Sequence, residues 1–177
     1  MRPRLIKTTN ELSLTVVFAA LYAAGVAVLA PISFSFFQVR VADSLLPLAI
    51  LFGWPAIIGI SLGTIVCNFF GGLGIIDVIG GTAANLVATF LAWKIGQRKI
   101  KGSWPVAIAV QIAVVTLIVG SYLSYLFQIP LLLGMLGVLV GSAIAIGILG
   151  YIILTVLTRT HILNLDAHTN MRSNNTD

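Results

Sequence analysis

The stretch WPVAIAVQIAVVTLIVGSYLSYLF, residues 104–127, contains no charged side chain. About 20 predominantly apolar residues are enough for an α-helix to cross the hydrocarbon core of a bilayer. Lipid offers the backbone no hydrogen-bond partners, so an apolar segment of this length has to satisfy its own peptide groups by becoming helical. The stretch therefore predicts a transmembrane helix.

Five further apolar segments surround this one, at residues 12–30, 42–52, 56–71, 76–96 and 131–158. Proline and glycine interrupt the chain between them, as at Pro31 and at Gly53-Trp54-Pro55. The segments at 42–52 and 56–71 are shorter than a full span, which predicts that they are tilted or packed inside the bundle. The sequence thus predicts an all-α integral membrane protein, a bundle of six transmembrane helices.

The composition agrees with this fold class. Of the 177 residues, 59% are hydrophobic and only 8% are charged, whereas soluble domains carry about 25% charged residues. The net charge of +5 comes from short basic clusters beside apolar runs rather than from a basic face with interleaved aromatic residues. We therefore expect contact with the lipid bilayer and no nucleic-acid partner.

The basic clusters also predict the orientation. They precede the first segment, separate the fourth from the fifth and follow the sixth: Arg2, Arg4 and Lys7; Lys94, Arg98, Lys99 and Lys101; Arg159 and Arg172. After zero, four and six crossings the chain is on the same side, so the positive-inside rule predicts that both termini are cytoplasmic. We expect a cytoplasmic segment at 1–11, a retained rather than cleaved first helix within a membrane domain at 12–159, and a disordered cytoplasmic tail at 160–177.

Polar residues after the first segment are candidates for a binding site. Gln38, Arg40 and Asp43 fall on the predicted outer side. Arg40 and Asp43 are three positions apart, so a helix beginning near them brings both to one face. Two readings stay open and are compatible: an interfacial ion pair with Asp43 as helix cap, or direct contacts with a solute.

A second polar group lies at the same predicted depth. Asn68 is near the end of the third segment, Asp77 begins the fourth, and Asn85 follows about two helical turns later on roughly the same face. Asp77 could be a helix cap, and the two asparagines could form interhelical hydrogen bonds. Because ionised side chains are costly within a membrane, their convergence at the outer end favours a solute site, which Gln128 would join.

Small residues predict close helix contacts. Ala19, Ala20, Ala23 and Ala24 form overlapping small-xxx-small pairs on the first helix, and Gly59 and Gly63 form a GxxxG pair. For the glycine pair we expect packing within the bundle. For the alanine face, packing within the bundle and docking of a partner membrane protein are both open.

Motifs of ATP-hydrolysing and zinc-dependent enzymes are absent from the sequence, which contains no GxxxxGK[ST] phosphate-binding loop and no HExxH. Its single cysteine is Cys67. We therefore expect a protein that is not an enzyme, uses no cofactor and holds no metal. If it moves a solute at the expense of ATP, another subunit must supply the ATPase.

Two stretches together resemble a known family. Residues 37–47, FQVRVADSLLP, resemble a signature that combines Gln, Arg, an acid and Leu-Pro, with Asp43 where a glutamate is usual. Residues 55–59, PAIIG, continue through Gly63, Asn68 and Gly71 to DVIGG at 77–81. Over about residues 10–160 the chain resembles the QueT queuosine-precursor transporters, which are substrate-binding S-components of energy-coupling factor (ECF) transporters.

The resemblance implies a function and partners. It implies an S-component-like six-helix subunit of the cell membrane that captures a 7-deazaguanine such as preQ1 and is energised by a membrane T-component and two ATPase subunits. Docking on the T-component would involve Ala19, Ala20, Ala23 and Ala24. Substrate contacts would come from Gln38, Arg40, Asp43, Asn68, Asp77 and Asn85.

The chemistry of these side chains suits such a solute. One carboxylate can accept hydrogen bonds from a guanine-type N1–H and its exocyclic amine, and a second can pair with an aminomethyl cation. Asp43 and Asp77 are the candidates for these roles, in either assignment, and Phe36, Phe37 or Phe69 could stack on the ring. The alternatives are an S-component for another vitamin or nucleobase-like solute, and a membrane scaffold subunit that transports nothing.

Overall fold

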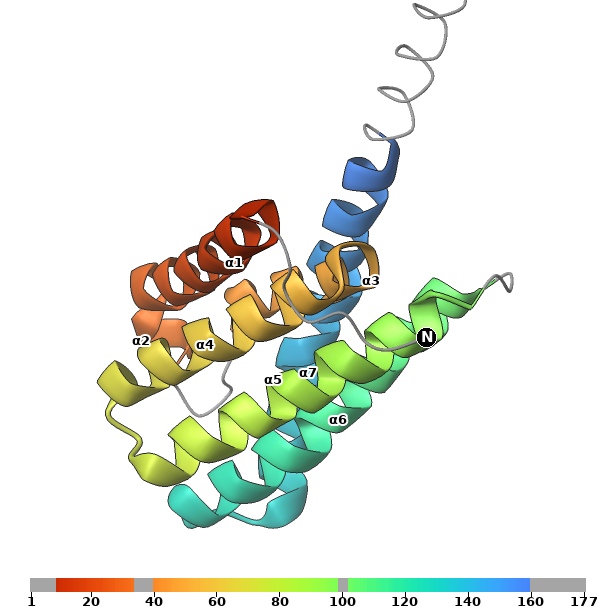
Figure 1. Cartoon of the computed structure of the whole chain (residues 1–177). Helices are drawn as coiled ribbons and strands as arrows, with labels where there is room; N and C mark the ends of the chain where they lie inside the picture. Colours follow the sequence, from red (N-terminus) through yellow and green to blue (C-terminus); the bar gives the residue numbers. More distant parts are fainter. Residues whose placement is uncertain (1–8, 34–39, 99–101, 160–177) are drawn as a thin grey trace, which may run out of the picture.

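The computed structural model describes residues 9–33, 40–98 and 102–159, and all regular structure within them is helical (Figure 1). In chain order the elements are α1 (Thr9–Val28), α2 (Ala30–Ser33), the 3-10 helix η1 (Val41–Leu48), α3 (Ala49–Phe52), α4 (Trp54–Gly71), α5 (Ile75–Gly96), α6 (Ser103–Leu126), α7 (Leu131–Ser142) and the π-helical stretch η2 (Ala143–Gly150). Helix α7 and η2 continue as one apolar helix to Arg159.

Five helices in the described part of the chain are long and apolar enough to cross a membrane. They are Thr9–Val28, Trp54–Gly71, Ile75–Gly96, Ser103–Leu126 and Leu131–Arg159. The remaining predicted segment forms a shorter apolar helix, Val41–Phe52. The prediction of an all-α membrane protein is confirmed, whereas by length and composition only five of the six predicted spans qualify.

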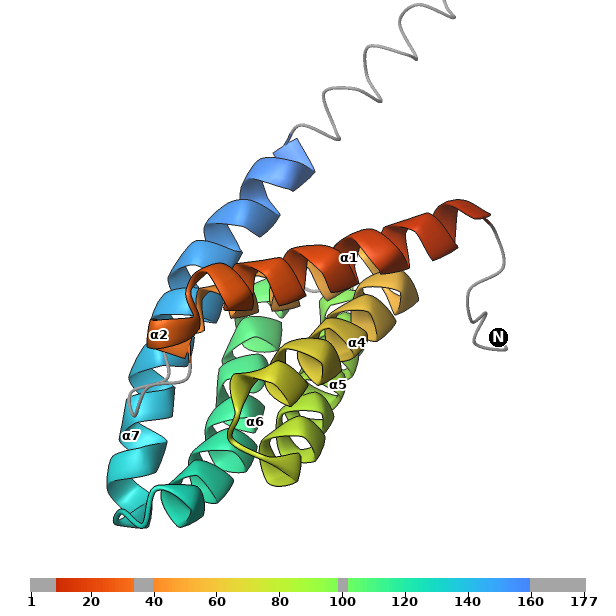
Figure 2. The ribbon, with the colours of Figure 1, turned by 90° about the vertical axis from the view of Figure 1, so that its left-hand side faces the viewer.

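Helices α4, α5, α6 and α7 run in alternating directions through the bundle, whereas α1 runs in the same direction as α4 (Figures 1 and 2). The start of α1, the junction of α3 with α4, the end of α5 and the end of the last helix lie at one end, which we call the basic end because it carries Lys94, Arg98 and Arg159. The turns from α4 to α5 and from α6 to α7 lie at the other end, the turn end. Gly72 closes helix α4 there in the left-handed conformation, at φ 82°.

The surface of the bundle is apolar and its interior contains polar groups. Large exposed hydrophobic side chains occur on all five long helices, among them Leu21, Phe70, Ile79, Leu117 and Ile152. Only 22% of the apolar window of α1 is buried, against 56% for α4. A soluble protein could not present such a surface to water, whereas lipid solvates it, so these faces identify the membrane-contacting surface.

The short segment is enclosed by the other helices, as its length predicts. Most of η1 is buried, including Asp43 and Ser44, and its Pro47 lies against Gly150 of η2. A Cβ atom on Gly150 would come within 2.8 Å of the Pro47 ring. Backbone that is not α-helical survives at membrane depth only where protein covers it, and this position satisfies that condition.

Glycines allow α1 to lie directly on α4. A Cβ atom on Gly59 would lie 2.5 Å from the carbonyl oxygen of Thr15, and one on Gly63 would lie 2.7 Å from that of Ala19. The prediction that this pair packs within the bundle is therefore confirmed. The contact fixes which face of α1 turns toward the interior and brings Tyr22 of that face to the centre.

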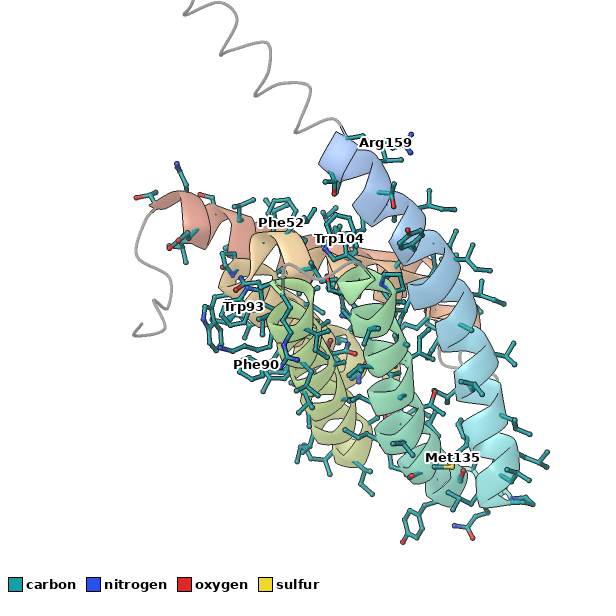
Figure 3. The ribbon with its side chains drawn as sticks, turned by 90° about the vertical axis from the view of Figure 1, so that its right-hand side faces the viewer. Phe52, Phe90, Trp93, Trp104, Met135 and Arg159 are labelled. Atoms are coloured by element: carbon teal, nitrogen blue, oxygen red, sulfur yellow. The ribbon has the colours of Figure 1, made fainter. Side chains whose placement is uncertain are left out.

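Aromatic side chains gather near the basic end (Figure 3). The rings of Trp54 and Trp93 lie 5.7 Å apart, and Phe90 lies 5.9 Å from Trp54. The Lys94 ammonium lies 4.9 Å from the Trp93 ring centroid. Tryptophan and lysine at this level are typical of a membrane–water interface, where an amphipathic ring meets the headgroups.

Candidate functional site

A set of buried polar side chains spans the interior and forms what we call the polar network. Its members come from α1, the start of η1, α4, α5 and α6, and each is buried or nearly so except the partly buried Tyr122: Tyr22, Arg40, Asp43, Thr64, Asn68, Asp77, Asn85 and Tyr122. Burying such groups in a lipid-surrounded bundle is unfavourable unless they bind one another or a ligand. Their joint presence therefore marks a candidate binding site.

One half of the network is centred on Asp43. The Tyr22 hydroxyl donates to Asp43 Oδ1 at 2.6 Å, and Asn85 Nδ2 donates to the Tyr22 oxygen at 2.8 Å. Asn85 Nδ2 also donates to Thr64 Oγ1 at 2.8 Å. These bonds join four elements, α1, η1, α4 and α5, through side chains that are far apart in the sequence.

The other half is centred on Asp77 in the first turn of α5. The Tyr122 hydroxyl donates to Asp77 Oδ1 at 2.7 Å, and Arg40 Nη2 lies 4.0 Å from the same oxygen. Asn68 Nδ2 donates to the main-chain carbonyl of Asp77 at 2.8 Å. Arg40 is only 5% exposed and Asp77 is fully buried, so this ion pair is shielded from water.

The two halves meet at a small internal space. Its lining combines three charged or amide side chains with four from α6 and α7: Arg40, Asp43 and Asn85, and Val115, Val119, Val138 and Ser142. The space measures about 10 Å³, which is close to the least that holds one water molecule. Charged and amide groups share this lining with valine side chains, a combination typical of solute sites.

The prediction that the side chains of Asp43 and Asp77 cap the starts of helices is wrong. Helix α5 begins after Gly74, and the Asp77 carboxylate accepts from Tyr122 instead of capping the helix. Residue 40 holds the cap position of η1, and the Asp43 carboxylate accepts from Tyr22. The expected interhelical hydrogen bonds of Asn68 and Asn85 are confirmed. Whether any of these residues touches a solute stays a prediction.

The glutamine and phenylalanine side chains that were also predicted near the solute lie outside the polar network or outside the described residues. Gln38 lies outside the described residues, as do Phe36 and Phe37. Gln128 is exposed in the turn after α6, where its side-chain amide donates to the Tyr125 carbonyl. Phe69 is 69% exposed and packs against Phe70, so it lies on the outer surface rather than over the polar network.

Two tyrosines that hydrogen-bond the aspartates of the polar network were not predicted from the sequence. Tyr22 and Tyr122 each donate to one carboxylate. Both lie within long apolar segments, whereas tyrosines of membrane proteins are typically concentrated at the interfaces. A buried tyrosine hydroxyl usually has a hydrogen-bond partner. Because both tyrosines lie within predicted apolar segments, their hydroxyls could have been expected to bond polar partners inside the bundle.

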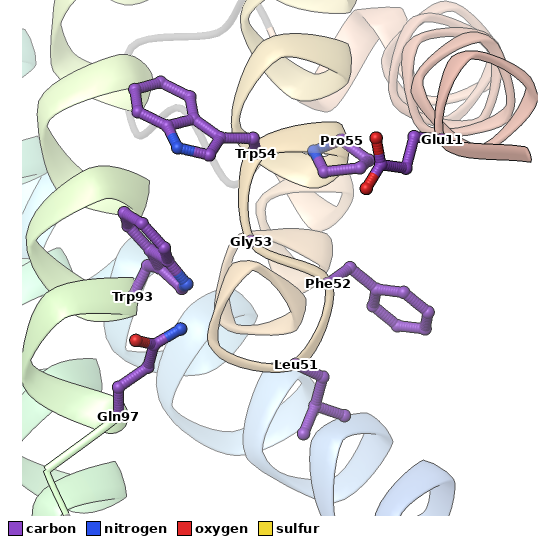
Figure 4. A pocket seen from close by; sticks show the side chains of 8 residues that line it. All are labelled: Glu11, Leu51, Phe52, Gly53, Trp54, Pro55, Trp93 and Gln97. Atoms are coloured by element: carbon purple, nitrogen blue, oxygen red, sulfur yellow. The ribbon is translucent and has the colours of Figure 1, made fainter. Parts of the chain in front are cut away.

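The larger cavities lie elsewhere. One of about 210 Å³ lies at the basic end beside Gly53, and its lining includes Glu11, Trp93 and Gln97 (Figure 4). A groove of about 450 Å³ lies between α1 and α4 and is lined mainly by apolar residues. Neither contains a member of the polar network, so burial and charge identify the site better than cavity size does.

The four alanines proposed for partner docking do not share one environment. Ala20 and Ala24 are exposed, whereas Ala19 and Ala23 are partly buried, and Ala19 lies against Gly59 and Gly63 of α4. Ala23 and Ala24 line the groove between α1 and α4. Within the described residues, no group of three or more histidine, cysteine, aspartate or glutamate side chains could hold a metal ion.

A bundle with an apolar exterior and enclosed charged side chains defines the chain as a multi-pass membrane protein. The chain belongs to the QueT transporter family, whose model, described as QueT transporter, matches residues 12–159. The family is one of membrane transporters, and the match confirms the family suggested by the sequence. No curated protein and no solved structure matches the chain.

Proposed function

We propose that this protein is the substrate-capture subunit, or S-component, of an ECF transporter and that its solute is a 7-deazaguanine such as preQ1. The observation that carries the proposal is the polar network, in which Arg40, Asp43 and Asn85 converge on one internal space. A purine-like base presents several donors and acceptors on a flat ring, and the network offers carboxylate, guanidinium and amide groups within one enclosed region.

The small size of the internal space has a consequence for binding. About 10 Å³ cannot hold a bicyclic base, so we infer that binding enlarges the space. The side chain of Val138 on α7 has no hydrogen-bonding group, and neither Tyr22 nor Tyr122 lies on α7, so this helix could move away from the polar residues without breaking the bonds of either tyrosine. The solute would then replace a packed apolar contact.

We also propose that the short segment Val41–Phe52 is the second pass of a bundle that crosses the membrane six times. Segment Val41–Phe52 combines eight residues of 3-10 helix with four of α-helix. Because a 3-10 helix rises more per residue than an α-helix, the segment spans about 22 Å. Enclosed between the other helices, it can serve as the second pass although it is short. With six passes, the basic clusters support a cell-membrane protein with both termini in the cytoplasm.

A binding measurement tests the capture function. We expect the purified protein to bind labelled preQ1 saturably, and the double variant Asp43→Ala with Asp77→Ala to lose binding by roughly a hundredfold or more, because each aspartate contributes a charge-assisted hydrogen bond. The matched control combines Ile79→Ala with Leu86→Ala on the exposed face of α5. It should bind like the unaltered protein.

The outcomes separate the competing functions. Undiminished binding by the double aspartate variant would refute the site. Stronger competition by a vitamin or another nucleobase would keep the capture function and change the solute. The scaffold alternative expects no saturable binding of any of these compounds, so an absence of binding by a folded protein would favour it.

We also propose that the T-component docks on the groove between α1 and α4. Exposed Ala20 and Ala24 leave room for a close helix contact, and the groove is wide and apolar. The ATPase subunits would act through this membrane partner, since the chain has no phosphate-binding loop of its own.

Filling this groove should separate uptake from binding. We expect Ala24→Trp to lower uptake by roughly tenfold in cells that contain the partner subunits, because an indole would hold the partner helix away. Binding of preQ1 to the purified variant should be unchanged. Leu86→Trp, on an exposed face of α5, is the control and should keep normal uptake. Equal uptake by both variants would argue against docking at this groove.

A further inference from the structure

Asp77 is held at several points by side chains from other elements. Its main-chain carbonyl accepts from Asn68 Nδ2, and its Oδ1 accepts from the Tyr122 hydroxyl. Arg40 Nη2 approaches the same Oδ1 at 4.0 Å. The Tyr122 hydroxyl and the Arg40 guanidinium both approach Oδ1, which fixes the orientation of the carboxylate and leaves Oδ2 for another donor.

The second oxygen, Asp77 Oδ2, has no hydrogen-bond partner among the residues that the structure describes. Asp77 is fully buried, so water outside the bundle does not reach this oxygen freely. A buried carboxylate oxygen without a donor is costly, and native proteins retain such groups mainly where they have a function. The natural complement is one N–H or ammonium donor.

Two consecutive glycines make room for this arrangement. A Cβ atom on Gly80 would lie 2.8 Å from the Tyr122 ring, and one on Gly81 would lie 2.5 Å from Asn68 Nδ2. Larger residues at these positions would push away both groups that hold Asp77. The close approach of Tyr122 and Asn68 thus explains the glycine pair on α5.

The charges of the polar network support a cationic ligand group. The network contains one arginine, Arg40, and two aspartates, Asp43 and Asp77, all buried. In a region of low dielectric, a cation on the solute would offset the second carboxylate. Asp77 Oδ2 has no donor among the described residues, so it can accept from one ammonium group without displacing Tyr122 from Oδ1.

We propose that Asp77 Oδ2 receives the single cationic group of the solute, the aminomethyl group of a 7-deazaguanine, and that Tyr122 is the positioning residue that aims this oxygen. Asp43, which lines the internal space, is then left for the guanine edge. This assignment rests on the proposed capture function and decides between two roles that the side-chain chemistry alone leaves open.

Two ligands that differ only at position 7 test the assignment. Dissociation constants are measured for 7-aminomethyl-7-deazaguanine and its neutral 7-cyano analogue with the unaltered protein and with Asp77→Asn, Tyr122→Phe and Asp43→Asn. We expect Asp77→Asn to weaken the aminomethyl compound roughly tenfold to a hundredfold, and the cyano compound by less than about threefold, because a hydrogen bond to a charged group is lost. Asp43→Asn should weaken both compounds alike.

Tyr122→Phe keeps the ring on the glycine pair and removes only the hydroxyl. We expect it to reduce the preference for the aminomethyl compound several-fold, roughly the effect of one hydrogen bond. Tyr125→Phe is the matched control, since Tyr125 lies on the same helix and is 68% exposed. It should leave the preference unchanged. A merely structural role of Tyr122 would change both affinities equally.

Each outcome bears on one of the two proposals. If Asp77→Asn weakens both compounds alike, or if Asp43→Asn abolishes the preference, the assignment is overturned while the capture function stands. If the unaltered folded protein binds neither compound, the capture function itself fails. Should Asp77→Asn not fold, as judged by thermal unfolding in detergent, the loss of preference in Tyr122→Phe decides the question.

Discussion

Replacing Arg40 with methionine is expected to destabilise this protein by about 3–5 kcal/mol, the range found when one partner of a buried ion pair is removed. Arg40 is 5% exposed and lies beside Asp77, and it shares an internal space with Asp43. Methionine keeps much of the length and apolar contact of the side chain but leaves two buried carboxylates without this cation. Thermal or denaturant unfolding in detergent measures the loss.

A second substitution distinguishes charge from packing. Adding Asp77→Asn to Arg40→Met removes one uncompensated carboxylate, so the double variant should recover part of the lost stability. Arg98→Met is the control, because Arg98 is exposed at the basic end; its effect should stay within about 0.5 kcal/mol. A double variant less stable than Arg40→Met alone would show that the arginine acts mainly through its packing.

Replacing Gly59 with alanine is expected to cost about 1–3 kcal/mol, although alanine is the better helix former. The added methyl group would lie 2.5 Å from the Thr15 carbonyl and 2.7 Å from Phe18 Cβ, so α1 would have to move away from α4. That movement would also displace Tyr22 from Asp43 and Asn85. We therefore expect weaker solute binding together with lower stability.

Gly147→Ala provides the comparison for this variant. A Cβ atom on Gly147 would lie 3.4 Å from Ile112 Cδ1, an ordinary contact with the end of a flexible side chain. Its unfolding midpoint and solute affinity should stay close to those of the unaltered protein. Equal stability of the Gly59 and Gly147 variants would mean that α1 is free to shift without cost, contrary to the close contact described above.

The sequence predicted the fold class well but the structure of the short segment Val41–Phe52 less well. Long apolar runs such as 104–127 must be helical in lipid whatever their neighbours are, so five spans could be recognised locally. The backbone of Val41–Phe52 could not be predicted in the same way. Its 3-10 geometry depends on enclosure by other helices and on the contact of Pro47 with Gly150, which is remote in sequence.

For the candidate site, the sequence identified chemistry but not partners. Arg40, Asp43, Asn68, Asp77 and Asn85 stand out because charged and amide side chains are rare in apolar segments. Their local positions suggested helix caps and an ion pair three residues apart. The structure instead shows Asp43 accepting from Tyr22 and Asp77 accepting from Tyr122.

By itself, then, the sequence determined that the chain is a helical membrane protein with polar groups that need compensation, because the cost of exposing backbone and charge to lipid depends on composition alone. Only the tertiary structure decided how that compensation is made. The bonds from Tyr22 to Asp43 and from Tyr122 to Asp77 join residues 21 and 45 positions apart. Such pairs depend on how helices pack, and close contacts such as Thr15 on Gly59 set that packing.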